Sequence, residues 1–309
     1  MSVQDSGRED PAAKWRRRAT YASVTVALTL IVVKLGTYLA TQSVAILSSL
    51  IDSSVDALAS VVTLFGVSRA LRPPDQSHRF GHGKAEPLAA LAQAAFVTGS
   101  AVFLGYEAIS RLISPTQVEQ SLIGIAVMVF AIVLTAGLIL FQRWVIRRTG
   151  SIAIDADSLH YSGDLFMNMA VIAALALTAY TGSPYWDPIF ALGISAFLIW
   201  SASRILNSAM GVLMDRELAD GDRDRIAQLV LAHPQSRGLH DLRTRSTGLG
   251  QHIEFHLELD SHLTLTEAHD ITDEIEQILR QAYPVSELTI HQEPAGLEDE
   301  RLDDRLVGR

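Results

Sequence analysis

The sequence predicts an α-helical membrane protein: a bundle of six transmembrane helices followed by a small cytoplasmic α+β domain. Two observations favour this class. Only 19% of the 309 residues are charged, against about a quarter in soluble domains, and long blocks carry almost no charge. The final third of the chain, in contrast, is strongly acidic. The chain has no cysteine, which excludes disulfides and Cys-type zinc sites. The net charge of -9 and the lack of a dense basic stripe argue against nucleic acid as a partner.

Six apolar blocks supply the expected spans. The clearest, 121–141, has 21 residues without a charge, enough at about 1.5 Å per residue to cross a hydrocarbon core of roughly 30 Å. The blocks are apolar on nearly every face, which a soluble helical bundle would not show. The first block is too long for the apolar region of a signal peptide and lacks a clear cleavage site. In order, the expected spans are 20–40, 43–67, 86–109, 121–141, 152–180 and 187–203.

The short connections predict the orientation, because Lys and Arg accumulate on the cytoplasmic side of a membrane. Basic residues cluster before the first span, between the second and third, after the fourth and after the sixth: Lys14, Arg16, Arg17, Arg18, Arg69, Arg72, Arg79, Lys84, Arg143, Arg147, Arg148 and Arg204. The opposite connections hold only Arg111. Both termini are therefore expected in the cytoplasm. The expected parts are a cytoplasmic segment (1–18), the transmembrane domain (19–206), a cytoplasmic metal-binding domain (207–293) and a disordered acidic tail (294–309).

The cytoplasmic part differs from the bundle in composition and periodicity. Residues 207–309 hold 21 acidic and 10 basic side chains. In 251–260, Ile253, Phe255 and Leu257 alternate with His and Glu, which is typical of a half-buried strand. The same reasoning predicts helices at 222–233 and 265–283 and strands at 238–246, 251–260 and 287–292. Two helices and three strands in this order indicate a small α+β domain.

Two pairs of ionisable side chains lie in the second and fifth expected spans: Asp52 and Asp56 in the middle of the second, His160 and Asp164 in the fifth. A charged group at bilayer depth costs about 2.5–3.5 kcal/mol, so such residues mark a function. Each pair is spaced i, i+4 and shares one helix face. Because the two spans run antiparallel, the pairs meet at similar depth. Three carboxylates and one imidazole suit Zn²⁺, Fe²⁺, Cd²⁺ or Co²⁺ better than Ca²⁺, which prefers six to eight oxygens.

The same four side chains predict an exchange of metal for protons. Acids crowded in a low dielectric bind protons when no metal is present, and metal binds only deprotonated ligands. A channel or sensor that moves nothing uphill remains an alternative. An intramembrane metal-dependent hydrolase is less favoured, because the chain has no His-Glu-Xaa-Xaa-His run. Lys34 in the first span has no assigned partner.

Two further clusters lie outside the spans. In the loop after the second span, Asp75, His78 and His82 stand three and four residues apart. Seven of the ten histidines fall in 207–309. The strands could gather four of them and one acid at one edge of the sheet, as a metal site: His240, His256, His269, His291 and Glu293. The remaining three, His233, His252 and His262, are expected to be solvated.

These motifs resemble the cation diffusion facilitators, among them bacterial ferrous-iron and zinc efflux pumps. The resemblance covers roughly residues 15–294. It is carried by the Asp and His pairs of the two spans, by Phe80-Gly81-His82-Gly83-Lys84-Ala85-Glu86, by His240-Asp241-Leu242-Arg243-Thr244-Arg245 and by His291-Gln292-Glu293-Pro294. The family's last motif usually reads His-Gln-Asp-Pro, so Glu293 is a departure that puts the geometry of that ligand in doubt.

The resemblance implies a homodimeric metal/proton antiporter in a bacterial inner membrane, with a ferredoxin-like cytoplasmic domain. The transported and sensed ion would be Zn²⁺, with Fe²⁺ or Cd²⁺ as alternatives, and the partners a second copy, the lipid bilayer and protons. The resemblance also implies a transport site (Asp52, Asp56, His160 and Asp164), a loop site (Asp75, His78 and His82) and a binuclear tail site (His240, His256, His269, His291 and Glu293).

Overall fold

The computed structural model describes residues 11–42, 44–114 and 122–297. The expected tail from 298 onward, and residues 1–10 of the N-terminal segment, lie outside the described residues. The chain divides into two compact units, Met1–Met210 and Gly211–Arg309. The first holds most of the long helices and the second holds the sheet.

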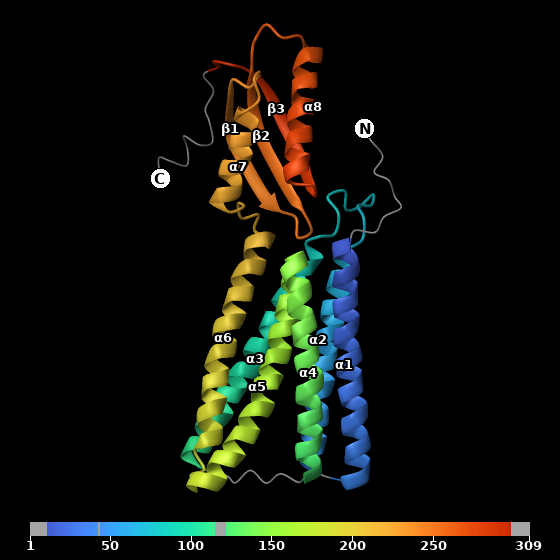
Figure 1. Ribbon diagram of the computed structural model, residues 1–309, viewed down its shortest axis with the longest axis vertical. Helices are drawn as coiled ribbons and strands as arrows, with labels where there is room; N and C mark the ends of the chain where they lie inside the picture. The colour runs from blue at the N-terminus through green and yellow to red at the C-terminus, as the bar shows by residue number, and fades with distance from the viewer. Residues whose placement is uncertain (1–10, 43, 115–121, 298–309) are drawn as a thin grey trace. The chain divides into compact units, whose positions relative to one another are not determined.

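Within the described residues, six helices are long and apolar enough to cross a membrane, which confirms the six predicted spans (Figure 1). They are α1 (Pro11–Thr41), α2 (Val44–Ala70), α3 (Ala85–Ile113), α4 (Leu122–Thr149), α5 (Ile152–Thr181) and α6 (Trp186–Leu213). Each helix is longer than its apolar block. The α4 helix, for example, continues from the apolar block through Arg147 and Arg148, because polar residues can extend a helix beyond the hydrocarbon core.

Small residues let the helices approach closely. A buried cluster of Ala90, Ala94, Ala156 and Ala209 joins α3, α5 and α6, as expected where van der Waals packing drives association in lipid. A Cβ added at Gly66 of α2 would collide with the Cβ of Ala89 in α3. The interior is therefore made by short side chains, which leaves room for a few polar groups.

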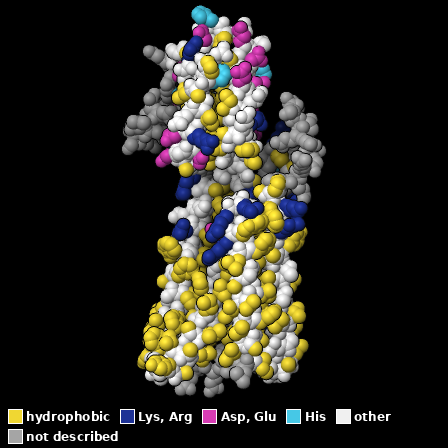
Figure 2. Space-filling view, in the orientation of Figure 1, with side chains coloured by type: hydrophobic (Ala, Val, Ile, Leu, Met, Phe, Trp, Pro, Cys, Tyr) yellow, Lys and Arg dark blue, Asp and Glu magenta, His cyan; other side chains and the backbone are white. Residues whose placement is uncertain are grey.

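The outer surface of the bundle matches a lipid environment. Figure 2 shows hydrophobic side chains over most of the visible face of the six-helix unit and Lys and Arg side chains gathered toward one end. At that end, the guanidinium of Arg148 lies 4.0 Å from the ring centre of Trp144, and that of Arg204 lies 5.2 Å from the ring centre of Trp200. Aromatic and basic side chains of this kind are typical of a membrane–water interface.

The second unit is an α+β domain, as predicted. Its elements are α7 (Asp220–Leu231), β1 (Gly238–Ser246), β2 (Gln251–Leu259), α8 (Leu265–Ala282) and β3 (Ser286–Pro294). The strand order is β1-β2-β3, with β1 antiparallel and β3 parallel to the central β2. The predicted boundaries of these elements differ from the observed ones by two residues at most.

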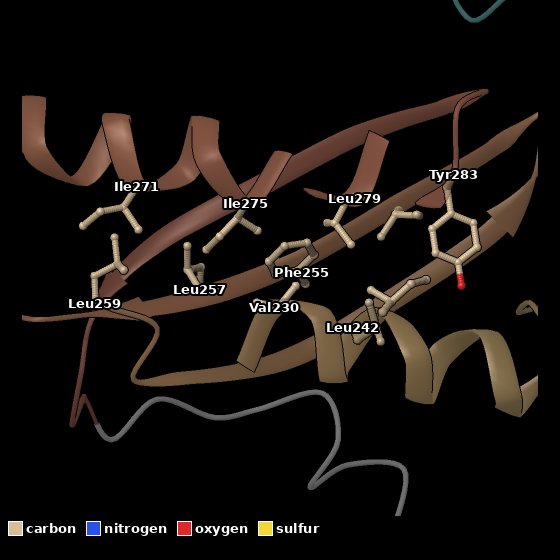
Figure 3. Packing of buried hydrophobic residues seen from close by; sticks show 11 residues of the cluster. Val230, Leu242, Phe255, Leu257, Leu259, Ile271, Ile275, Leu279 and Tyr283 are labelled. Atoms are coloured by element: carbon tan, nitrogen blue, oxygen red, sulfur yellow. The ribbon is translucent and has the colours of Figure 1, made fainter. Parts of the chain in front are cut away.

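Alternation in β2 decides which face of the sheet is buried. Ile253, Phe255 and Leu257 are fully buried against Ile275 and Leu279 of α8 and further residues of α7 (Figure 3). Because side chains alternate along a strand, the His and Glu residues between them project from the opposite face. This open face of the sheet carries His240, His256 and His291.

Candidate metal-binding sites

The acids and the imidazole of α2 and α5 meet inside the bundle. Asp56, His160 and Asp164 each offer a ligand atom, and these atoms all lie within 4.8 Å of one another. The His160 Nε2 atom lies 2.9 Å from Asp56 Oδ1, and the His160 side chain is only 8% exposed. Among the described residues, no Lys or Arg forms an ion pair with these acids. The Lys34 ammonium interacts with both acids at longer range. The cluster therefore has the donor set and the burial that suit a divalent cation.

Asp52 lies outside this group of three. It is one turn before Asp56 on α2 and its side chain is exposed. Lys34, for which the sequence offered no partner, donates to the Ser49 carbonyl oxygen at 3.1 Å and to Ser53 Oγ at 2.6 Å. The ammonium group is thus fixed to α2 within a turn of Asp52.

A further intramembrane acid, Asp157 of α5, was missed by the sequence reasoning. It is 1% exposed and its carboxylate accepts hydrogen bonds from four neutral side chains, one on each of the first four helices. The donors are Ser23 Oγ, Ser60 Oγ at 3.3 Å, Gln93 Nε2 at 3.0 Å and Gln142 Nε2 at 2.7 Å. Among the described residues, no Lys or Arg pairs with it. This node links five helices through one carboxylate.

The sequence did hold a signal for this residue. Asp157 precedes Asp164 by seven residues, or two helical turns, so the two acids lie on the same face of α5. An additional acid at helical spacing within an apolar span is as costly as the others and needs a partner. Its neutral donors, in contrast, come from four separate helices, and nothing in their local sequence marks them.

The loop after α2 gathers its three predicted residues. Ligand atoms of Asp75, His78 and His82 lie within 4.8 Å of one another, and the rings of His78 and His82 are 4.5 Å apart. His82 is buried and neither ring nitrogen makes a hydrogen bond; its Nε2 atom lies 3.3 Å from Asp75 Oδ2 without hydrogen-bond alignment. A buried imidazole with both nitrogens free fits a metal ligand.

Backbone hydrogen bonds fix the position of the Asp75 carboxylate in the loop. Asp75 Oδ1 accepts from the backbone N–H groups of His78 (2.8 Å) and Ser77 (2.9 Å), which is an Asx turn. The bond from the His78 N–H is the main cause that lowers the pKa of Asp75 below its usual value. The carboxylate is therefore ionised at neutral pH, as a metal ligand must be.

On the open face of the sheet, His240, His256 and Glu293 place ligand atoms within 4.8 Å of one another. The strand register puts His240 opposite His256 and His256 opposite His291. Glu293 Oε1 lies 2.7 Å from His256 Nδ1, and Glu293 Oε2 lies 3.2 Å from His240 Nε2. The longer side chain of Glu293, noted as a departure from the family pattern, thus reaches two histidines. Imidazoles and a carboxylate are a donor set suited to Zn²⁺.

Two of the predicted tail residues lie outside that group. His291 is 64% exposed with Nε2 3.4 Å from Glu293 Oε1, and His269 of α8 is 66% exposed with Nε2 3.7 Å from Asp273. A residue missed from sequence, Glu258, places Oε1 3.1 Å from His240 Nδ1. It lies on the same face of β2 as His256, so the strand alternation could have identified it.

The expectation that three tail histidines are solvated is wrong for two of them. His233 is buried at the end of α7, where its Nε2 atom lies 3.0 Å from Glu274 of α8. His252 is largely buried on the sheet, with ring nitrogens 3.8 and 3.9 Å from Glu254 and Glu287. Tertiary packing of a helix end and of adjacent strands accounts for both. Only His262 is exposed as expected.

Comparison with known proteins gives the same organisation. A family model described as the cation efflux transmembrane domain matches residues 20–214, and one described as the cation efflux protein cytoplasmic domain matches residues 218–295. The cation-efflux pump FieF of Cronobacter sakazakii is 45% identical over 280 residues, covering 91% of this chain and 93% of that protein. FieF of Salmonella typhimurium is 44% identical with the same coverage.

Solved structures of cytoplasmic domains of such transporters match the cytoplasmic part of the chain. CzrB in its Zn form is 36% identical, covers 28% of this chain and 99% of that chain, and has a TM-score of 0.26. The metal-bound C-terminal domain of the CzcD transporter from Thermotoga maritima is 26% identical, covers 26% of this chain and 100% of that chain, and has a TM-score of 0.25. The two family models and the full-length relatives together show that the chain belongs to the cation diffusion facilitator family, as a multi-pass cation-efflux transporter and not an enzyme.

Proposed function

We propose that the protein is a homodimeric antiporter of the bacterial inner membrane that exports Zn²⁺ from the cytoplasm in exchange for protons. Fe²⁺ and Cd²⁺ are alternative substrates. Both termini face the cytoplasm, in accord with the Lys and Arg residues at the connections on that side. The observation that carries the proposal is the convergence of Asp56, His160 and Asp164 within 4.8 Å inside an apolar bundle.

The transport site is expected to take a fourth ligand. Asp52 lies one turn from Asp56 on α2, so rotation of its side chain would bring its carboxylate toward the ion. Three carboxylates and one imidazole would then surround the substrate, a number and mixture of donors suited to tetrahedral Zn²⁺. Among the described residues, no Lys or Arg forms an ion pair with these acids and Lys34 acts on them only at longer range, so the ion would supply the positive charge in direct contact with them.

Proton coupling follows from the same ligands. His160 must be neutral and the acids ionised to bind a metal, so binding releases protons and proton uptake favours release. With protons more abundant outside, the returning form of the protein carries protons inward. Export of the metal is thereby driven by the proton gradient.

A cavity supports a release route for alternating access. The cavity has a volume of about 180 Å³. Its lining includes Lys34 of α1, Ile46 and Ser49 of α2, and Asn168 of α5. Ser49 precedes Asp52 on α2 and Asn168 follows Asp164 on α5, so the cavity lies on the side of the cluster that the charge distribution assigns to the exterior. The Asn168 amide donates to the Asp164 carbonyl oxygen at 2.9 Å.

The cytoplasmic site is proposed to sense metal. His240, His256 and Glu293 would hold the ion, with His269 and His291 completing a binuclear site across the dimer. Residues 207–309 carry an excess of acids, so two copies repel each other. A bound divalent ion cancels two negative charges and would stabilise the dimer contact, which couples cytoplasmic metal to transport.

Reconstituted protein tests the transport proposal. Proteoliposomes with a pH-sensitive dye inside are exposed to Zn²⁺, and both metal uptake and proton release are followed. Wild type is expected to move Zn²⁺ with opposite proton flux, and Asp164→Asn to show neither. Glu107→Gln is a matched control, because Glu107 is a half-exposed acid of the same unit that pairs with Arg111 outside the cluster. It should transport at the wild-type rate.

Two results would contradict the proposal. Zinc flux through Asp164→Asn at the wild-type rate would remove the site assignment. Metal accumulation against a gradient that persists with a protonophore would remove proton coupling, and purely downhill flux would favour a channel. Parallel runs with Fe²⁺, Cd²⁺ and Co²⁺ rank the substrates.

A further inference from the structure

The bundle contains a second, larger cavity, distinct from the proposed transport route. It has a volume of about 570 Å³, within the roughly 300–1,000 Å³ of ligand pockets. It lies among the end of α4, the beginning of α5 and the second half of α6. Its charged and aromatic lining consists of Arg143, Asp155, Phe197, Trp200 and Arg204.

The cavity is on the opposite side of α5 from the metal cluster. Ser151, Asp155, Ser158 and Ser162 line the cavity and recur at spacings of four, three and four along the helix. His160 stands two residues before Ser162, about 200° away around the helix at 3.6 residues per turn. The helix thus has two polar faces, and the transport site accounts for only one of them.

The charges of the cavity select an anion. Two guanidinium groups, of Arg143 and Arg204, face one carboxylate, that of Asp155. Among the described residues, neither guanidinium has a hydrogen-bond or ion-pair partner within 4 Å, and that of Arg204 lies over the ring of Trp200. A net positive lining disfavours the passage of a divalent cation, so the cavity is not a second entrance for the metal.

The start of α5 adds to this preference. Ser151 caps the helix by accepting from the Ile154 N–H, and both Ser151 and Ile152 line the cavity. The positive end of a helix dipole and its free N–H groups attract phosphate. Guanidinium groups bind phosphate through paired N–H donors. Both features therefore point to the same ligand chemistry.

The position of the cavity identifies the source of the phosphate. Arg143 of its lining lies on the last part of α4, the end of the helix that also carries Arg147 and Arg148, and Trp200 and Phe197 supply apolar wall. Basic pockets between transmembrane helices on the cytoplasmic side bind lipid headgroups. One of the two arginines offsets the charge of Asp155. The lining therefore keeps one net positive charge, which the single negative charge of a phosphodiester would balance.

We propose that this cavity binds the headgroup of an anionic phospholipid from the leaflet at the Arg-rich end of the bundle. Arg143 and Arg204 would hold the phosphate from α4 and α6, and the serines would bind the remaining headgroup oxygens. The acyl chains would follow the exposed apolar surface of α6. Such a lipid would link α6 to α4 across the cavity.

The test uses the full-length protein purified in detergent. Retention of dioleoylphosphatidylglycerol is measured by native mass spectrometry and compared with dioleoylphosphatidylcholine and with inorganic phosphate. Wild type is expected to retain phosphatidylglycerol in preference to both. Arg143→Gln/Arg204→Gln should weaken its binding by at least about tenfold, the scale expected for loss of two basic groups near an anionic headgroup.

A matched variant removes the same charge outside the cavity. Arg147→Gln/Arg148→Gln changes two exposed arginines at the same end of α4 and should bind phosphatidylglycerol as wild type does. Ser208→Trp, which fills the cavity from α6 without a change in charge, should lose binding and guards against misfolding of the double arginine variant. Thermal unfolding is measured for every variant.

Three outcomes would overturn the proposal. Equal retention of phosphatidylglycerol by wild type and by a folded Arg143→Gln/Arg204→Gln variant would show that the cavity does not hold the lipid. Equal loss in the Arg147→Gln/Arg148→Gln variant would show general surface attraction. Displacement of the lipid by inorganic phosphate at comparable concentration would assign the cavity to a soluble anion.

Discussion

Two carboxylates of α5, seven residues apart on one face of the helix, have different kinds of neighbours. Asp157 accepts four hydrogen bonds from neutral side chains of α1, α2, α3 and α4. Asp164, about 10.5 Å further along the helix, lies within 4.8 Å of the ligand atoms of Asp56 and His160. One acid is surrounded by neutral hydrogen-bond donors, and the other by ionisable side chains.

The difference shows why a buried acid does not by itself mark a metal site. A buried charge is tolerated when enough hydrogen bonds replace its lost hydration. At Asp157 these bonds come from the protein, so an added cation would have to displace them. At Asp164 they are incomplete without an ion. We infer that Asp157 is the fixed point that positions α5, and that Asp164 belongs to the part of the helix that binds and releases substrate.

The largest expected effect is therefore on stability, at Asp157. Asp157→Ala removes the acceptor shared by four buried donors. Gln142 Nε2 still reaches Ser23 Oγ at 2.9 Å, and Ser60 Oγ still lies 2.8 Å from the Tyr161 hydroxyl. Ser23 Oγ and Gln93 Nε2 lose their acceptor, and each such buried group costs roughly 1–3 kcal/mol. The thermal unfolding midpoint of the purified protein in detergent should fall by many degrees, with low yield. Asp157→Asn, which retains one acceptor oxygen, should be intermediate. A midpoint within a degree or two of wild type for Asp157→Ala would show that the node does not hold the bundle.

The matching change at Asp164 should act on binding and spare stability. Asp164→Asn removes one of two crowded acids, so the metal-free midpoint should equal or exceed that of wild type. Saturating Cd²⁺ stabilises a protein by about 2.7 kcal/mol at 100 times the dissociation constant of a site. In Asp164→Asn, the part of the Cd²⁺ stabilisation that comes from the transport site should disappear. Titration calorimetry should show one fewer ion bound per protomer. An unchanged stoichiometry would show that Asp164 is not needed for metal binding at this site.

In the cytoplasmic metal site, two acids next to one histidine are also expected to differ in role, with a smaller effect on substitution. His240 has one nitrogen near Glu258 and the other near Glu293. With Glu293 as the proposed ligand, Glu258 would be the acid that orients the ring. Loss of such an orienting partner weakens metal affinity roughly 10–100-fold. Glu258→Gln should therefore lower affinity at the cytoplasmic site and keep its stoichiometry. Glu254→Gln, on the same face of β2 and 4.0 Å from Arg243, is the control and should change neither.

The features that depend on a local pattern of residues could be predicted from the sequence. Apolar length predicted the six helices, alternation predicted β2 and its two faces, and the i, i+4 spacing predicted that Asp56 and His160 meet. Each of these follows from one segment or from two segments of known direction. The cluster in the loop was found for the same reason, since its three residues lie within one short stretch.

What the sequence did not reveal depends on several segments at once. The donors to Asp157 are common Ser and Gln residues on four helices, and only their packing brings them to one carboxylate. His233 was expected to be solvated because its partner, Glu274, lies on another helix. The exposure of Asp52 depends on how α2 turns within the bundle, which hydropathy alone does not fix.

The smallest expected effect concerns an acid held at the surface. Glu267 of α8 forms a capping box with Thr264, accepting from its backbone N–H and from its hydroxyl, both at 2.8 Å. The bond from the Thr264 backbone is the main cause that lowers the pKa of Glu267 below its ordinary 4.5. A lowered folded pKa means that this stabilisation is complete above pH 4.5 and is lost as pH falls through the folded value. Hydrogen exchange of the first turn of α8, followed by mass spectrometry, should therefore quicken below pH 4.5 beyond its intrinsic pH dependence. In Glu267→Gln this extra change should be absent, and its persistence there would assign the pH dependence to another acid of the domain.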